Sequence, residues 1–234
     1  MLIDLHAHTK GISTCCRVYA PEVLKAAKEA GLDGICLCNH YLSRYVENGN
    51  TLAFAQRYVE EFYHTRKLGQ EMGMEVLFGI EVTMERHESQ HLLVYGVGED
   101  FPLLNSNLYD LTQKELYRLV HANGGVLVQA HPVRRGKNVL MDPEFLDGVE
   151  VNCHPLYDAT HHAMLGELAR ERGWILTCGG DYHADTHRPK CGMYLPETVT
   201  DGIALGAYLK NSTTVRLCVQ EVGEMTTFEK VYTR

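Results

Sequence analysis

The sequence has little of what marks a membrane-bound, fibrous or disordered protein. Its 234 residues include only 7 Pro and 1 Trp, no low-complexity segment and no apolar run long enough to span a membrane. Basic residues are also scarce, with 22 Lys and Arg against 30 Asp and Glu and a formal net charge of −8. Because proteins that bind nucleic acid normally carry a basic face, this balance argues against such a partner. We therefore expect a globular protein that binds neither membrane nor nucleic acid.

An export signal and a zinc-ribbon pattern are missing as well. Asp4, His6 and His8 interrupt any apolar segment at the N-terminus. Among the 8 Cys, Cys36 and Cys38 are too close together in the sequence for a zinc ribbon, and no second pair has the spacing that would complete such a site. We therefore expect a cytoplasmic protein with free thiols. The residue that is present in unusual number is histidine, with 13 in the chain.

Short apolar runs alternate with helical stretches along the chain. Strands are expected at residues 2–5, 34–38, 75–80, 91–96, 125–129, 148–151, 174–178 and 215–219. Helices are expected at residues 21–30, 51–73, 112–122, 159–172 and 201–209. This alternation favours a single parallel α/β domain over residues 1–234, either a barrel or a doubly wound sheet. The pattern of the tail at 220–234 fits a docked strand and a loose segment equally well.

Potential metal ligands follow the carboxyl ends of the expected strands, which is where α/β enzymes assemble their active sites. They are His6, His8, His40, Glu81, His131, Asp181 and His183. One such residue would be unremarkable, but several separate strand ends carrying them is hard to attribute to chance. Only His91 opens a strand instead of ending one. Because imidazole and carboxylate together suit zinc, manganese or iron, the pattern predicts a metal centre.

Short motifs around these residues occur in the order that a known family shows. They lie at 4–9 (DLHAHT), 38–40 (CNH), 79–82 (GIEV), 130–132 (AHP) and 180–183 (GDYH). As a set they resemble the motifs of the PHP family (polymerase and histidinol phosphatase). The resemblance implies a distorted, TIM-like (β/α)7 barrel with two or three divalent ions (Zn, Fe or Mn) that hydrolyses phosphate esters.

The resemblance also implies which residues hold the ions. The first ion would be held by His6, His8, Glu81 and Asp181. A second would be held by His91 and His131 together with Glu81, which would bridge the two. His40 and His183 would hold a third. Glu81, Asp181 and His183 are accordingly the expected catalytic residues.

The sequence departs from the family pattern at two places. Many relatives complete the third site with Asp or His where this chain has Cys15 or Cys16. We expect at least one of these thiols to face the metals, the alternative being that both pack under the loop. A thiolate suits zinc or iron better than manganese. Asn39 replaces the usual Asp before His40, and we expect it to tune the site without binding metal.

Several cations lie on loops that leave the same strand ends and could bind a phosphate group. They are Arg17, Arg134, Arg135, Lys137, Arg188 and Lys190, with Arg17 and Arg134 as the first choices. Each could equally be a solvated loop residue. His154 and Asn152 follow the strand at 148–151. His154 is a candidate for substrate contact or for acid catalysis at the leaving group, or else a surface histidine.

These features together predict a phosphatase for a small phosphomonoester, of the histidinol-phosphate, nucleotide or sugar-phosphate class. The expected mechanism is attack of a metal-bridging hydroxide with no covalent enzyme intermediate. Two alternatives stay open. One is a phosphodiesterase or exonuclease acting on cyclic or diester phosphates. The other is a metal-binding PHP module without catalysis.

Overall fold

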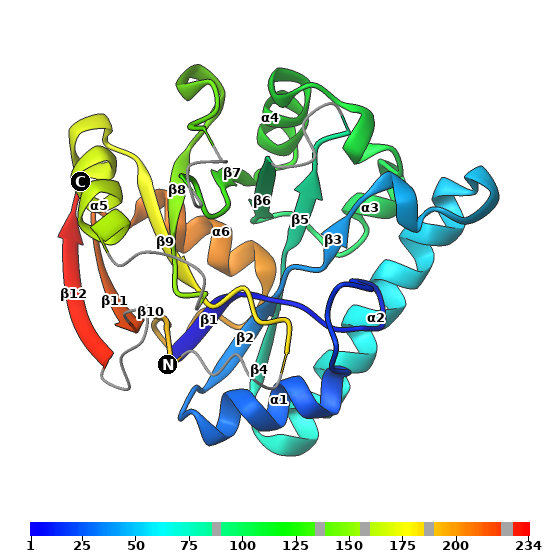
Figure 1. The fold of residues 1–234 in the computed structure, drawn as a ribbon, viewed down its shortest axis with the longest axis horizontal. Helices are drawn as coiled ribbons and strands as arrows, with labels where there is room; N and C mark the ends of the chain where they lie inside the picture. Colours follow the sequence, from blue (N-terminus) through cyan, green and yellow to red (C-terminus); the bar gives the residue numbers. More distant parts are fainter. Residues whose placement is uncertain (86–89, 134–138, 155–159, 185–189, 221–226) are drawn as a thin grey trace.

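The computed structural model describes residues 1–85, 90–133, 139–154, 160–184, 190–220 and 227–234. They form a mixed α/β fold with two six-stranded sheets. Figure 1 shows the strands in the middle of the molecule, with helices arranged around them. In these residues no helix is both long and apolar enough to cross a membrane. Arg134, Arg135, Lys137 and Arg188 lie outside the described residues.

The first sheet has the order β12-β11-β10-β1-β2-β4. Its parallel half contains β1 (Leu2–Ala7), β2 (Gly34–Leu37) and β4 (Glu75–Phe78). Its antiparallel half contains β10 (Gly192–Tyr194), β11 (Thr214–Gln220) and β12 (Thr227–Thr233). The tail therefore docks as a strand, with Thr214 opposite Thr233. β10 lies between the strands expected at 174–178 and 215–219, where the sequence pattern indicated no strand, so the sequence analysis missed it.

The second sheet has the order β3-β5-β6-β7-β8-β9. These strands are β3 (His40–Tyr41), β5 (Ile80–Thr83), β6 (His91–Tyr95), β7 (Val126–Gln129), β8 (Gly148–Asn152) and β9 (Ile175–Gly179). β6 is antiparallel to both of its neighbours. Because of this reversal, His91 at the start of β6 pairs with Thr83 at the end of β5. His91 therefore lies at the same edge of the sheet as Glu81, which is in β5.

The chain passes from the first sheet into the second at two places, after β2 and after β4. The second passage is at Gly79, where a Cβ would lie only 2.5 Å from Cys38 Sγ and 2.9 Å from Cys36 Sγ. On the far side, Ala7 and Tyr182 form an isolated parallel bridge, so the segment after β9 lies against β1. The hydrogen-bonded ladders of the described strands nevertheless form two sheets and no closed ring, so the expected (β/α)7 barrel is found only in part.

The main helices begin and end within about two residues of the predicted bounds. They are α1 (Ala20–Glu29), α2 (Thr51–Met72), α4 (Gln113–Ala122), α5 (Thr160–Arg172) and α6 (Gly202–Asn211). Shorter turns are α3 (Phe101–Leu104), η1 (Ser43–Tyr45), η2 (Glu47–Gly49), η3 (Leu108–Asp110) and η5 (Pro143–Phe145). Local capping explains the agreement. Thr112 and Glu115 form a capping box at α4, and Asn50 accepts a hydrogen bond from Ala53 N at α2.

Strands β1, β2, β5, β7, β8 and β9 are buried along their whole length. This is expected for strands covered on both faces. Into this apolar interior the chain places an unusual set of polar side chains, among them His6, His8, Glu81, Glu150 and Asp181, each at most 2 % exposed. Burying such groups costs free energy unless they have partners, so their surroundings decide what they do.

Candidate metal centre

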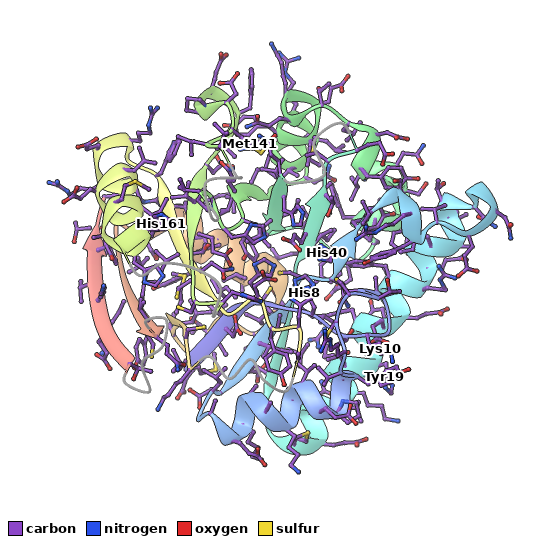
Figure 2. All side chains as sticks on the ribbon, in the orientation of Figure 1. His8, Lys10, Tyr19, His40, Met141 and His161 are labelled. Carbon is purple, nitrogen blue, oxygen red and sulfur yellow. The ribbon has the colours of Figure 1, made fainter. Side chains whose placement is uncertain are left out.

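The Glu81 carboxylate is fully buried and lies at the middle of a group of histidines. Its Oε1 atom lies 2.8 Å from His91 Nδ1, 3.1 Å from His131 Nε2 and 3.4 Å from His6 Nε2. Its Oε2 atom lies 2.7 Å from His40 Nδ1 and 3.4 Å from His8 Nε2. Figure 2 shows His8 and His40 close together near the middle of the molecule. Both carboxylate oxygens thus face different imidazoles, which is the geometry that a bridging ligand needs.

Asp181 brings a second carboxylate to the same group. Its Oδ1 atom lies 3.1 Å from His183 Nδ1, 3.2 Å from His8 Nε2 and 3.7 Å from His6 Nε2. The backbone N–H of Asp181 donates to the carbonyl of His6 at 2.8 Å, which holds the loop after β9 against β1. Asp181 therefore connects the segment after β9 with the histidines of β1 and the loop that follows it.

Asp181 and His131 both have left-handed backbone conformations, with φ of 51° and 30°. Such conformations cost about 1–3 kcal/mol for a residue other than glycine and persist where the surroundings impose them. For His131 the constraint is visible, because its backbone N–H donates to Glu150 Oε2 at 2.9 Å. Strain of this kind gathers at functional sites.

Glu150 is a residue of the centre that the sequence analysis missed. It is fully buried in β8, and its Oε1 atom lies 2.8 Å from His6 Nδ1. When Nδ1–H donates to this carboxylate, the lone pair of His6 Nε2 is left facing the other ligands. Gly179 makes this contact possible, since a Cβ there would lie 2.4 Å from His6 Cβ and 2.8 Å from Glu150 Oε1. An acid in the otherwise apolar run at 148–151 was the sign in the sequence.

Ser13 and Asn39 orient His8 in the same way. Asn39 Oδ1 accepts from Thr9 N at 2.8 Å and from Ser13 Oγ at 2.9 Å. Because the only proton of the Ser13 hydroxyl goes to Asn39, the 3.1 Å contact between Ser13 Oγ and His8 Nδ1 requires that nitrogen to donate. His8 Nε2 is then left with its lone pair. The side chain of Asn39 contacts Thr9 and Ser13, and that it tunes the site without binding metal stays a prediction.

The Nε2 atoms of His6 and His8 lie 3.0 Å apart, so with both rings neutral and protonated on Nδ1 their lone pairs would face each other. Among the described residues, Glu81 Oε2 and Asp181 Oδ1 are buried oxygens with no hydrogen-bond donor in suitable geometry. A cation among these atoms would satisfy both the nitrogens and the oxygens. The donor set therefore fits divalent metal ions, and buried charge of this density requires such compensation.

Three overlapping groups of side chains could each hold an ion, since their ligand atoms lie within 4.8 Å of one another. They are His6, His8 and Glu81; His40, Glu81 and His91; and His8, His40 and His183. The grouping differs slightly from the expected one, because His40 lies close to Glu81 as well as to His183. His131 approaches the same Glu81 oxygen as His91. The structure thus brings together all of the histidines and carboxylates expected as ligands.

The carboxylates of the cluster are held in their ionised form. Burial raises the pKa of Glu81, but His40, His91 and His6 outweigh it and hold that pKa well below its usual range. Burial likewise raises the pKa of Asp181, but His183 and His6 outweigh it, and the pKa of Asp181 is also well below its usual range. Asp4 differs. Burial raises its pKa to about 7, although its Oδ1 atom accepts hydrogen bonds from His6 N and Gly180 N. Asp4 therefore acts as a backbone anchor for both loops.

The structure separates the two candidate thiols. Burial raises the pKa of the Cys15 thiol, but hydrogen bonds with His183 and His40 lower it to about 5. Cys16 is buried and directs its Sγ atom to the carbonyls of His8 and Val18, each at 3.5 Å, and burial raises its pKa. Cys15 is therefore the thiol beside the centre, whereas Cys16 packs under the loop.

The candidate substrate residues have different environments. Arg17 is exposed, and its backbone N–H donates to the carbonyl of His183 at 2.8 Å. His154 is buried beside the centre, with its ring centroid 6.5 Å from that of His183. The Asn152 side chain accepts from His154 N and donates to Glu150 Oε2. Lys190 is exposed on the segment before β10.

Comparison with solved structures finds the same fold in proteins of low sequence identity. A proposed metal-dependent phosphoesterase from Bifidobacterium adolescentis is 17 % identical, with a TM-score of 0.52 over 87 % of this chain and 93 % of that one. PsfC from Pseudomonas syringae is 20 % identical, with a TM-score of 0.62 over 88 % and 86 %. An amidohydrolase from Chromobacterium violaceum, solved with sulfate and without metal, is 15 % identical, with a TM-score of 0.52 over 84 % and 93 %.

Sequence comparison identifies the family. No curated protein matches the chain at a significant level. The PHP domain profile, however, matches residues 4–170, which is well over half of the sequence and includes most of the motifs described above. The chain therefore belongs to the PHP domain family.

Proposed function

We propose that this protein is a metal-dependent phosphoesterase whose substrate is a small phosphomonoester. The observation that carries the proposal is the pair of ionised, buried carboxylates, Glu81 and Asp181, towards which the histidine nitrogens converge. Membership of the PHP domain family supports metal-dependent hydrolysis as the chemistry. The fold shared with a proposed metal-dependent phosphoesterase supports it as well.

In this proposal each ion has its own set of ligands. The first would be held by His6, His8, Glu81 and Asp181, and the second by Glu81, His91 and His131. The third would be held by His40, His183 and Cys15, and this thiolate would favour zinc or iron at that position because thiolate is a poor manganese ligand. When bound, the ions supply a Lewis acid for the phosphate oxygens and an activated water.

The remaining residues of the centre position these ligands. Glu150 and Ser13 orient His6 and His8 through their Nδ1 atoms, which leaves both Nε2 atoms directed at the centre as the nitrogens that would bind metal. Asp4 ties the backbone of His6 to that of Gly180, which holds β1 against the Asp181 loop. Because this shell is buried, the ligands need little reorganisation when substrate binds.

His154 and Arg17 are the proposed substrate contacts. His154 is at the edge of the centre near His183, where an imidazole could give a proton to the departing alcohol oxygen. Arg17 is exposed on the loop that hydrogen-bonds to His183, where a guanidinium could bind a phosphate oxygen. Arg134, Arg135 and Arg188 stay candidates for the same task on the basis of their sequence positions alone.

The experiment that tests the proposal is a substrate panel on protein reconstituted separately with Zn²⁺, Mn²⁺ and Fe²⁺. The panel contains 4-nitrophenyl phosphate, sugar and nucleoside monophosphates, and bis(4-nitrophenyl) phosphate as a diester. We expect turnover of monoesters that disappears on chelation and returns with metal. Preferential cleavage of the diester would identify a phosphodiesterase. No turnover of any ester by metal-loaded protein would point to a non-catalytic module and would contradict the proposal.

A further inference from the structure

A cleft with charged residues in its wall lies beside the metal centre. None of the expected metal ligands or candidate substrate residues that the structure describes lines it. It has a volume of about 570 Å³, which is in the range of small-molecule sites. Its walls come from the loop after β1, from the turns η1 and η2, and from the first part of α2. Figure 1 shows that loop curling against α2.

One layer of the chain separates the cleft from the centre. On the inner side of the loop, Ser13 Oγ contacts His8 Nδ1 and accepts from His40 N, while the next residue, Thr14, lines the cleft. Tyr45, also in the cleft wall, directs its hydroxyl to Cys15 Sγ at 3.7 Å. Because Cys15 is exposed, a molecule whose phosphate lies at the metals could reach the cleft over the outside of this loop, past Cys15.

The two arginines of the cleft have different partners. Arg57 is held in place, because it donates to Glu47 Oε1 at 2.7 Å and to the carbonyl of Tyr45 at 3.0 Å. Arg44 is exposed, with its guanidinium over the Tyr45 ring at 5.5 Å from the centroid. In the part of the chain that the structure describes, no carboxylate lies within 4.0 Å of Arg44. Two Arg and one Glu give the cleft wall an excess positive charge in a protein whose net charge is −8.

We propose that this cleft binds the part of the substrate that does not react, and that Arg44 binds a second anionic group there. The inference rests on the proposed function and narrows its substrate class to phosphomonoesters that carry a further phosphate or a carboxylate. A guanidinium stacked on a ring keeps its donors free and oriented for such an oxyanion. Binding energy gained at this distance from the metals can hold the reacting phosphate in position.

The test measures binding without turnover, by calorimetry on metal-loaded protein with three stable probes. Methylphosphonate carries one anionic group, 1,3-propylenediphosphonate carries two phosphonates, and 3-phosphonopropionate pairs a phosphonate with a carboxylate. We expect the better of the two probes with two anionic groups to bind roughly tenfold more tightly than methylphosphonate. If the diphosphonate binds more tightly, the second anionic group of the substrate is a phosphate; if 3-phosphonopropionate binds more tightly, it is a carboxylate. Metal content is measured before and after each titration, so that stripping of metal is not mistaken for binding.

The variants assign the preference to Arg44. In Arg44→Gln the tenfold difference should vanish while methylphosphonate binds as before, and Arg44→Lys should keep part of it. Arg172→Gln is the matched control, because Arg172 is an exposed arginine over an aromatic ring, 5.0 Å from the Trp174 centroid. Equal binding of all three probes to the wild type, or an unchanged preference in Arg44→Gln, would overturn the inference. Failure of the proposed function looks different, since probe binding would persist without hydrolysis of any ester.

Discussion

The histidine–carboxylate centre and the buried cysteines can be compared directly, because both consist of potential metal ligands held inside the fold. Cys36 and Cys38 have Sγ atoms 3.7 Å apart, and those of Cys153 and Cys178 are 3.9 Å apart. Yet the thiols of Cys38 and Cys178 donate to backbone carbonyls, at 3.4 Å in each case. Cys36, Cys38 and Cys178 also lie in or beside regular strands.

The centre differs from the cysteines in two physical respects. It contains buried carboxylate oxygens that lack a hydrogen-bond donor in suitable geometry among the described residues, and two imidazole Nε2 atoms, of His6 and His8, only 3.0 Å apart. It also contains left-handed backbone at Asp181 and His131. Burial and the capacity to bind metal are therefore shared by both groups, whereas of these two groups it is the centre that combines unsatisfied carboxylate oxygens with left-handed backbone. The following predictions use this difference, from the largest expected effect to the smallest.

Asp181→Asn should abolish most of the activity. Asparagine tolerates the left-handed conformation as well as aspartate does, so the change removes the charge and leaves the backbone preference intact. We expect kcat/KM to fall by roughly 10²–10³-fold or more, together with a loss of bound metal. Circular dichroism should show the fold retained. The control is Asp147→Asn, at a carboxylate paired with His121 away from the centre, and full metal content with full activity in Asp181→Asn would refute the assignment.

Glu150→Gln should weaken the centre without removing a ligand. The amide cannot accept the His6 Nδ1–H and the His131 backbone N–H as a carboxylate does. Losses of roughly 10–100-fold in metal affinity are typical for partners of this type. Competition with a chelator measures the affinity, and activity at saturating metal should recover substantially. Glu75→Gln, in β4 of the same fold, serves as the control. An unchanged affinity for Glu150→Gln would remove it from the centre.

Activity should fall as the pH drops. Burial lowers the pKa values of His40 and His183, but Glu81 outweighs it at His40 and Asp181 outweighs it at His183, which raises these values to about 9 and about 11, so protons compete for these nitrogens from above neutral pH downward. The pKa values of Glu81 and Asp181 lie below their usual range, so these carboxylates stay ionised as the pH falls. Imidazole nitrogens that hold a metal must be neutral, so protons compete with the ions and affinity rises with pH. Metal retention and kcat/KM measured between pH 8 and 5 should decline together. A flat profile would contradict imidazole ligation.

Cys36→Ala should affect stability alone. The Cys36 side chain is fully buried in β2, so its removal leaves a small cavity and should lower the free energy of unfolding by about 1 kcal/mol. Denaturant unfolding measures this, while metal content and kcat/KM should match the wild type. If this variant lost metal as Asp181→Asn does, the distinction between the two buried groups would fail.

Much of the centre could be predicted from sequence because it depends on local rules. His6, His8, His40 and Glu81 follow the strands that the sequence predicts, and parallel strands bring their carboxyl ends to one edge. Helix ends were predictable for a similar reason, since caps such as Thr112 and Asn50 act within one turn. Motif resemblance added His91, whose position makes sense only once β6 is seen to run antiparallel.

What escaped the sequence depends on contacts between distant parts of the chain. Glu150 acts on His6, 144 residues away, and the Asp4 carboxylate reaches Gly180 across 176 residues. No local pattern encodes such pairs. The choice between Cys15 and Cys16 also needed the loop conformation, since adjacent side chains point in different directions. β10 was missed because its pairing with β1 is likewise non-local, whereas β12, left open from the sequence, pairs with the strand that precedes it in the chain.

The central claim is that the Glu81 and Asp181 cluster binds metal ions, and elemental analysis of the purified protein tests it most directly. Metal per chain is counted for the wild type and for Cys15→Ser, with Cys16→Ser as the matched neighbour. The account predicts two or three equivalents of zinc, iron or manganese in the wild type, one fewer in Cys15→Ser and no change in Cys16→Ser. Less than one equivalent in the wild type, with no uptake on reconstitution, would contradict it.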